Sequence, residues 1–290
     1  MKVIKHRKKF FILSSVVILV GLIMMVAKGF DEGIDFTGGT LIQIDFGKEV
    51  PVAEVREISN ALDPNADIIH AGDNNQEVII KTTKDMNNDE RLAFFQKYAS
   101  KYNLKDDALK QSERFTASIG QELKNKAFLS VIIATLCMLV YITIRFEFKF
   151  GLAAVIALVH DVLVMLSAYA ILRITVNGSF VAAILTIVGY SINDTIVVFD
   201  RIRENIGNFK RNQVEELIDT SITQTITRTI NTSATTLMSI IFLYIFGVDA
   251  IRNFALPLII GIAVGTYSSI FIASPLWYEF TMRVKERKSA

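Results

Sequence analysis

Six predominantly apolar runs, each long enough to cross a lipid bilayer, dominate this sequence of 290 residues. A helix rises about 1.5 Å per residue, so about 20 apolar residues span roughly 30 Å of hydrocarbon. The runs cover about 10–27, 127–144, 151–172, 179–199, 229–246 and 254–278. Backbone groups in lipid must be hydrogen-bonded within the span, which a helix achieves alone. The sequence therefore predicts a polytopic α-helical membrane protein with six transmembrane helices.

Lysine and arginine are concentrated in every second connection between these runs. They stand before the first run and after the second, fourth and sixth: Lys2, Lys5, Arg7, Lys8, Lys9, Arg145, Lys149, Arg201, Arg203, Lys210, Arg211, Arg283, Lys285, Arg287 and Lys288. The short connections on the other side contain little more than Arg173 and Arg252. Since short cytoplasmic loops are rich in basic residues, we expect both termini in the cytoplasm. The first run is longer than a signal-peptide core and precedes no small-residue cleavage site, so we expect an uncleaved anchor.

The runs and loops together predict three parts. Residues 1–27 are the cytoplasmic N-terminus and first span, and residues 28–126 are an extracytoplasmic α+β domain. Residues 127–290 carry the other five spans, with a cytoplasmic loop at 200–228 and a cytoplasmic tail.

The extracytoplasmic domain alternates strand and helix patterns. Strands are predicted at 40–46, 67–70, 77–82 and 112–118, and helices at 51–62 and 88–102. The order βαββαβ is that of a ferredoxin-like split βαβ fold. Such a fold hosts many functions, so it identifies no ligand.

Several classes of function find no support in the sequence. The net charge of +2 provides no case for binding nucleic acid. No Gly-x-x-x-x-Gly-Lys-Ser/Thr loop is present for nucleotide hydrolysis. Cys137 is the only cysteine, so no intrachain disulfide forms. We expect a protein that is not an enzyme and that has neither cofactor nor metal.

Asn193 and Asp194 lie within the fourth run, where an ionisable residue costs about 2.5–3.5 kcal/mol to insert. Steps of three and four place small and polar residues on the same side of that helix: Ala182, Ala183, Thr186, Gly189, Tyr190, Asn193 and Asp194. Small side chains let helices approach closely, so we expect this face to point into the bundle. A shielded Asp194 could then load and release a proton. The alternatives are a carboxylate that reaches the cytoplasmic interface, or a fixed salt bridge.

Arg228, at the entrance to the fifth run, is the expected cationic partner of Asp194. A polar stripe continues from it along that run: Asn231, Thr232, Thr235 and Thr236. The alternative is that Arg228 is an ordinary basic anchor at the interface.

His160 and Asp161 lie near the middle of the third run. Adjacent helical residues point about 100° apart, so the two need not face one partner. Joining an ion relay and bracing the bundle are both open. No second histidine or cysteine stands at metal-ligand spacing.

The connection after the fourth run begins with alternating charges at 200–205, typical of a solvated helix end. Residues 214–226 predict an amphipathic helix with Val214, Leu217, Ile218 and Ile222 on its apolar face. This helix either lies on the membrane surface or packs under the spans.

Three segments resemble motifs of the SecF family of protein-export membrane proteins. Gly33-Ile-Asp35-Phe-Thr-Gly38-Gly39-Thr lies just after the first run and is similar to a signature shared with SecD. The segments at 189–205 and 227–233 are similar to the family motifs of the fourth and fifth spans. The six-span layout matches over the whole chain.

The resemblance implies a pseudo-symmetric complex with SecD, of the resistance–nodulation–division type, in a bacterial or archaeal cytoplasmic membrane. It implies work beside the SecYEG channel, often with YajC, on an unfolded polypeptide during translocation. It implies a proton or sodium gradient as driving force, with Asp194 and Arg228 in the relay and a further carboxylate supplied by SecD. Tyr190, Asn193, His160, Asp161, Asn231 and Thr232 form the expected supporting cluster.

The expected mechanism is alternating protonation of Asp194, which weakens its attraction to Arg228 and lets the helices shift. Two alternatives remain open. One is a small-molecule or lipid exporter of the same superfamily, and the other is a membrane scaffold whose polar groups only fix helix pairing.

Overall fold

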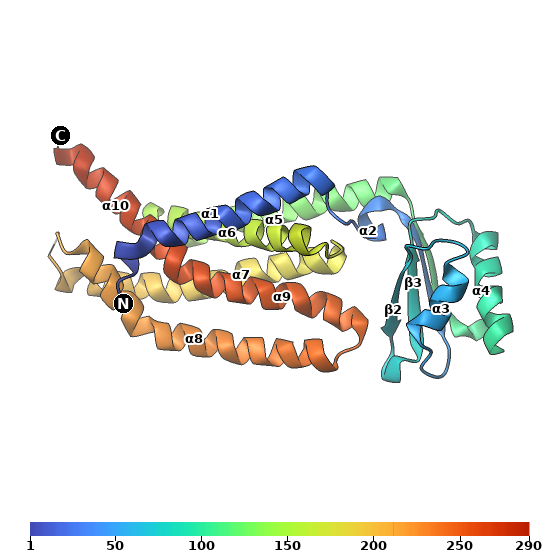
Figure 1. The fold of residues 1–290 in the computed structure, drawn as a ribbon. Coiled ribbons are helices and arrows are strands. Elements are labelled where there is room, and N and C mark those ends of the chain that lie inside the picture. The colour runs from blue at the N-terminus through green and yellow to red at the C-terminus, as the bar shows by residue number, and fades with distance from the viewer. Residues whose placement is uncertain (211, 290) are drawn as a thin grey trace.

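The computed structural model describes residues 1–210 and 212–289, with side chains except those of Asp73 and of residues 283–289. The molecule is elongated, with a helical bundle at one end and a small α/β domain at the other (Figure 1). Both termini lie at the end of the bundle that is remote from the domain.

In the described part of the chain, six helical segments are long and apolar enough to cross a membrane. They are α1 (Val3–Lys28), α5 (Ala117–Arg145), α6 (Phe148–Leu172), α7 (Gly178–Asn205), α8 (Val214–Phe246) and α9 (Asp249–Ser268) continued by a π-helical turn (Ser269–Ala273) and α10 (Ser274–Ser289). The predicted six-helix membrane fold is confirmed. A π turn inside a helix often marks a functional position.

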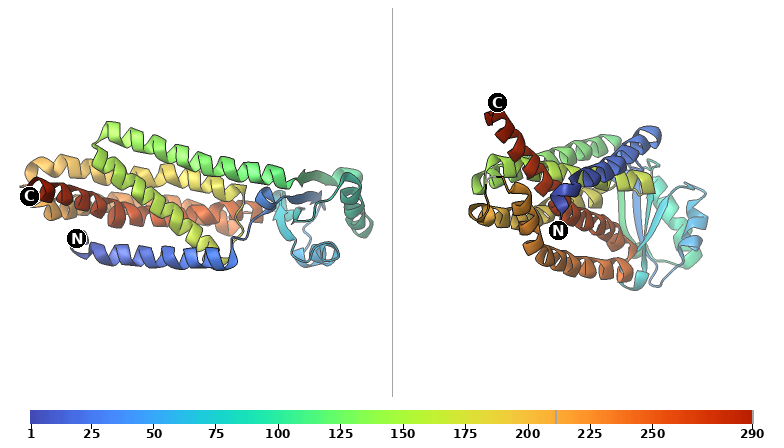
Figure 2. Two further views of the ribbon diagram at one scale, coloured as in Figure 1. Left: turned by 90° about the horizontal axis from the view of Figure 1, so that it is seen from above. Right: turned by 60° about the vertical axis from the view of Figure 1, so that its left-hand side comes forward.

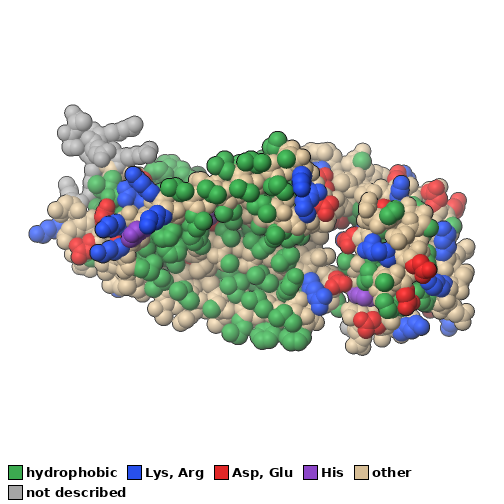
Figure 3. Space-filling model, viewed as in Figure 1, with side chains coloured by type: hydrophobic (Ala, Val, Ile, Leu, Met, Phe, Trp, Pro, Cys, Tyr) green, Lys and Arg blue, Asp and Glu red, His purple; other side chains and the backbone are tan. Residues whose placement is uncertain are grey.

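Three helices form the centre of the bundle and three form its edge. Buried apolar residues from α6, α7 and α9 make one continuous core, for example Leu158, Ile187 and Ile262. The helices α1 and α5 lie at opposite edges when the bundle is seen from above (Figure 2). Their outward side chains are apolar and exposed, as at Leu19 and Phe128, which are 57% and 70% exposed. Hydrophobic side chains cover the middle of the bundle in Figure 3, as a lipid-facing surface requires.

The fifth span differs from its predicted extent. One helix of 33 residues, α8, joins the expected amphipathic segment to the span. No glycine or proline interrupts residues 214–246, so the helix has no reason to break. Its apolar side chains Leu217, Ile218 and Ile222 are buried, so this segment packs under the spans. The connection predicted at 200–228 is confined to 206–213, between the ends of α7 and α8.

The small domain contains β1 (Gly39–Asp45), α3 (Val52–Ser59), β2 (Asp67–Ala71), β3 (Glu77–Thr82), α4 (Asn88–Tyr102) and β4 (Leu109–Phe115). Its sheet has the order β2-β3-β1-β4, with antiparallel pairs throughout. This order confirms the predicted ferredoxin-like fold. The helices α3 and α4 cover the face of the sheet turned away from the bundle (Figure 1). Ile42, Ile80 and Tyr98 lie in the core between the layers.

The last strand was predicted at 112–118, but it ends at Phe115. Thr116 caps a helix there, since its side chain accepts a hydrogen bond from the backbone N–H of Ile119. The chain therefore enters α5 at Ala117, before the expected start of the second span at 127.

The Gly38–Gly39 pair lies where the domain joins the bundle, after the short helix α2 (Ile34–Thr37). Both glycines have positive φ, 81° and 143°. A Cβ at Gly39 would lie 2.2 Å from the carbonyl oxygen of Thr82, and one at Gly38 would lie 2.9 Å from the backbone nitrogen of Ala117. The motif is therefore required by close backbone packing.

Candidate functional site

Asp194 is buried between three helices, with 3% of its surface exposed. Its Oδ2 accepts a hydrogen bond of 3.0 Å from the Ser233 hydroxyl on α8. Ser233 Oγ in turn accepts one of 2.7 Å from the Thr266 hydroxyl on α9. A chain of hydroxyl groups thus connects α9 and α8 to the carboxyl group on α7, as a route for a small ion or proton would require.

Arg228 does not lie beside Asp194 in this structure. Its side chain is exposed, and no ion pair joins it to Asp194 among the described residues. Arg228 precedes Ser233 by five positions, which places the two side chains about 140° apart around α8. Arg228 thus points away from Ser233, although Thr232, which also lies beside the Asp194 carboxyl, is only about 40° from Arg228 around the helix. The expected direct pairing is therefore not observed within this chain.

The predicted polar face of α7 is divided between two environments. Ala183 and Asp194 are buried, as expected. Four other members of that face are exposed: Ala182, Thr186, Gly189 and Asn193. Within this chain alone, therefore, only part of the predicted face points into the bundle. Residues 182, 186, 189 and 193 form one line along the helix, about 100° from the line through 183 and 194.

Exposed polar residues of α8 lie beside this exposed line. Tyr190 bridges the two helices, because its hydroxyl donates to the carbonyl oxygen of Thr232 and contacts Thr236 Oγ1 at 3.0 Å. Asn231 and Thr232 are exposed on α8, as is Arg228. Polar groups are costly in contact with lipid, whereas small and polar groups both suit contact with another helix. The surface formed by α7 and α8 thus has the chemistry of a helix-packing face.

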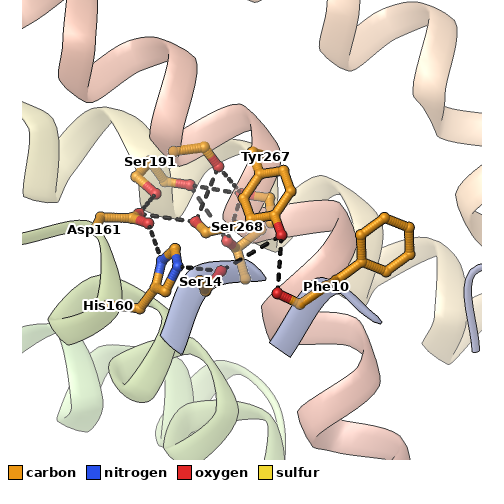
Figure 4. A network of polar contacts seen from close by, with 10 residues as sticks. Phe10, Ser14, His160, Asp161, Ser191, Tyr267 and Ser268 are labelled. Carbon is orange, nitrogen blue, oxygen red and sulfur yellow. Dashed lines mark hydrogen bonds and ion pairs between the residues drawn. The ribbon is translucent and has the colours of Figure 1, made fainter. Parts of the chain in front are cut away.

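A second buried polar centre surrounds His160 and Asp161 (Figure 4). Asp161 is 1% exposed and His160 8% exposed. Asp161 Oδ1 lies 3.0 Å from His160 Nδ1, while Oδ2 accepts hydrogen bonds from the hydroxyls of Ser191 at 2.6 Å and Ser268 at 2.8 Å. His160 Nε2 lies 2.9 Å from Ser14 Oγ on α1. Asp161 and His160 therefore link α6, the helix that carries them, to α1, α7 and α9.

The polar centre around Asp194 and the one around His160 and Asp161 both lie where α7 packs against α9, about one helical turn apart. A Cβ at Gly261 would lie 2.5 Å from Ile187, and one at Gly265 would lie 2.8 Å from Ser191 Cβ. The two glycines therefore let α9 approach α7 closely. Thr195 on α7 then contacts Ser269 on α9, at 2.8 Å between hydroxyl oxygens.

The hydroxyl partners of the two aspartates were not predicted from the sequence. Ser14, Ser191, Ser233, Thr266 and Ser268 lie among other polar residues of the spans, and nothing in the sequence distinguishes them from those neighbours. The steps of four and three from Gly261 to Gly265 and Ser268 are the one pattern that could have indicated them, since small residues at such spacing favour close helix packing. Within the described residues, no group of three or more His, Cys, Asp or Glu side chains converges as metal ligands.

The motif residue Asp35 lies at the outer end of the bundle. Its carboxylate accepts a hydrogen bond of 2.8 Å from the backbone N–H of Gly178, the first residue of α7. Gly33 donates its own N–H to the carbonyl oxygen of Val176 at 2.8 Å. The motif thus fastens the junction of the small domain to the helix that carries Asp194.

Comparison with known proteins identifies the same two regions. Residues 96–283 match the family model "Protein export membrane protein SecD/SecF, C-terminal", and residues 23–50 match the SecD/SecF GG motif. The protein translocase subunit SecF of Rhodothermus marinus is 38% identical over 98% of this chain and 94% of its own length. SecF of Haemophilus influenzae is 37% identical over 96% of this chain and 86% of its own length.

Solved structures give the same result. The crystal structure of SecDF from Thermus thermophilus, a translocon-associated membrane protein, matches with a TM-score of 0.80 and 34% identity over 97% of this chain. SecDF in a super-membrane-facing form matches with a TM-score of 0.73 and 33% identity. This chain spans only 38% and 40% of those two chains. The fold, the motifs and the full-length relatives agree, and the chain belongs to the SecF family of SecD/SecF protein export membrane proteins.

Proposed function

We propose that this chain is the SecF subunit of a protein translocase, working with a SecD-like second half to promote export of an unfolded polypeptide. The observation that carries the proposal is the position of Asp194, buried with hydroxyl ligands directly beside a polar helix surface that this chain leaves uncovered. At this position Asp194 would lie close to both this chain and the partner half.

The partner half is expected to cover the exposed surface of α7 and α8. This surface carries the exposed side chains of Asn193, Arg228 and Asn231. These groups need hydrogen-bond partners, which lipid does not supply. The SecDF structures hold a chain more than twice the length of this one, as a fusion of two such halves would. A carboxylate of the partner beside Arg228 would complete the relay. SecYEG and YajC are the further partners proposed from the family resemblance.

The coupling ion is proposed to be H⁺ or Na⁺, bound and released at Asp194. When the carboxylate is ionised, it accepts the hydrogen bond of Ser233. When it is neutralised, that bond weakens and α8 is released from α7. One charge moving through about 100 mV yields about 2.3 kcal/mol, which shifts a two-state equilibrium by a factor of roughly 50.

Two contacts are proposed to carry the helix movement to the small domain. Asp35 ties α2 to the start of α7, and the backbone N–H of His70 in β2 donates to Asp249 Oδ2 at the start of α9 at 3.2 Å. The basic loops and termini are proposed to be cytoplasmic and the small domain extracytoplasmic.

The test is export of a secretory protein into inverted membrane vesicles that contain the chain with its SecD-like partner. Gradient-stimulated export should be lost with Asp194→Asn and kept with Asp200→Asn, since Asp200 lies on the same helix but only partly buried. Equal stimulation by Asp194→Asn and the unaltered chain would refute the proposed role of Asp194.

A further inference from the structure

An apolar groove of about 500 Å³ lies between α5 and the pair α6 and α7. This volume falls within the roughly 300–1,000 Å³ of small-molecule sites. The walls are hydrocarbon side chains, including Phe128, Val131, Val162 and Leu166. The groove therefore suits an apolar chain rather than a polar solute.

One end of the groove carries a pair of opposite charges. Lys124 Nζ on α5 lies 2.6 Å from Glu32 Oε2, in the segment between α1 and α2. Both side chains line the groove, and each remains 33% exposed. Glu32 is held in place by a bridge between its backbone and that of Val176. This end of the groove, which we call its mouth, therefore carries the adjacent charges of Lys124 and Glu32, and both are accessible.

The length of the groove corresponds to one leaflet of a membrane. Its residues on α5 extend from Lys124 to Leu136, a rise of about 18 Å at about 1.5 Å per residue. Half of a hydrocarbon core of about 30 Å is about 15 Å. An occupant with its polar end at Lys124 would thus reach the middle of the bilayer.

We propose that this groove binds a zwitterionic phospholipid with a primary ammonium head group. The phosphate lies at Lys124, the ammonium donates to Glu32, and one acyl chain fills the space between α5 and α6–α7. The acyl chain leaves one hydrocarbon environment for another, so it contributes little to selection. The head group selects the lipid through charge-assisted hydrogen bonds.

Lys124 binds the phosphate of any phospholipid, and Glu32 discriminates among the head groups. A choline head group has no N–H to donate to Glu32, and an anionic glycerol head group brings no cation to it. An ethanolamine head group satisfies both Lys124 and Glu32. Because Phe36 of α2 also lines the groove, the bound lipid would support the junction between the small domain and the bundle.

Native mass spectrometry of the full chain, released from nanodiscs with equal amounts of phosphatidylethanolamine, phosphatidylcholine and phosphatidylglycerol, tests the proposal. Phosphatidylethanolamine should be retained about five-fold over either competitor, the selectivity of one hydrogen bond worth about 1 kcal/mol. Glu32→Gln should bring this ratio close to one, and Lys124→Met, which removes the contact to a phosphate that all three lipids carry, should lower the retention of each. Lys126→Met should not, since Lys126 pairs with Glu122 and does not line the groove.

A second pair of variants tests the groove itself. Val131→Phe fills it and should lower the amount of every retained lipid, whereas Leu129→Phe, at an exposed position outside the lining, should not. Equal retention of the three lipids by the unaltered chain would overturn the proposal. So would an ethanolamine preference that survives both Glu32→Gln and Val131→Phe, or a photocrosslink from Ile132 to a protein helix instead of lipid.

Discussion

Asp35 in α2 accepts a hydrogen bond of 2.8 Å from the backbone N–H of Gly178, at the start of α7. The first N–H groups of a helix have no partner within the helix, and a carboxylate there also meets the positive end of the helix dipole. The helix with Asp194 is thus tied at its outer end to the segment that leads into the small domain.

Replacing Asp35 by alanine should lower stability by about 1 kcal/mol, the usual cost of losing such a cap. It should also reduce gradient-stimulated export, because α7 then moves without the domain. Thermal unfolding in detergent and the vesicle assay measure the two effects. Asp107→Ala is the control, since Asp107 is an exposed carboxylate of the same domain. An Asp35→Ala protein with unchanged melting and export would contradict this role.

Asp63 should make the small domain sensitive to acid. Burial acts to raise the pKa of this carboxyl, but hydrogen bonds from the Thr82 hydroxyl at 2.6 Å and the Asn65 backbone outweigh it and hold the pKa below its usual value. A lowered pKa contributes stability above the pKa of the unfolded chain, about 3.9, and this is lost as pH falls through the folded pKa. We expect Asp63→Asn to cost about 2 kcal/mol at pH 7 and little near pH 2.

Hydrogen exchange of β3 in the full chain, followed from pH 7 to pH 2.5, measures the effect. The control is Asp85→Asn, because Asp85 also has a lowered pKa, from its hydrogen bond with Arg114, but lies on the surface. Surface ion pairs contribute little to stability. A pH dependence that is the same with and without Asp63 would show that this carboxyl is not responsible.

Most of the architecture could be predicted because its signals are local. Apolar runs give the spans, and alternating residues give strands such as β3, predicted and observed at residues 77–82. The prediction divided α8 into an amphipathic helix at 214–226 and a span at 229–246, because the side chains change from amphipathic to apolar there. The backbone nevertheless stays helical throughout. The end of β4 was misplaced because only the capping role of Thr116 separates strand from helix there.

The site was predictable only in part, because it depends on the rotation of whole helices. Burial of Asp194 was predicted from a face of small residues, yet several members of that face are exposed, because the rotation of α7 against α9 decides which line of residues is buried. The serines at 14, 191, 233 and 268 have polar neighbours in the sequence, and their spacing does not show which of these hydroxyls reach an aspartate. The position of Arg228 could not be predicted, because the rotation of α8 decides which of its polar residues reach Asp194, and here Ser233 does.

Asp161 is expected to brace the bundle rather than to carry the ion. Both of its carboxylate oxygens have hydrogen-bond partners, and it is sealed between α1, α6, α7 and α9. Asp161→Ala should therefore lower stability by about 3–5 kcal/mol, because it leaves the hydroxyls of Ser191 and Ser268 and the ring of His160 buried without this hydrogen-bond partner, at about 1–3 kcal/mol for each group. Thermal unfolding measures this, and export per folded molecule should be little changed in the milder Asp161→Asn. A stable Asp161→Asn protein without gradient-stimulated export would instead assign Asp161 to the relay.

The most direct measurement is ion uptake into proteoliposomes that contain the chain with its SecD-like partner. Uptake of H⁺ and of Na⁺ is recorded under an imposed gradient for the unaltered chain, Asp194→Asn and Asp200→Asn. We predict uptake of one of the two ions by the unaltered chain and by Asp200→Asn, and none by Asp194→Asn. Uptake by Asp194→Asn at the rate of the unaltered chain would contradict a charge-exchanging role for this carboxyl group.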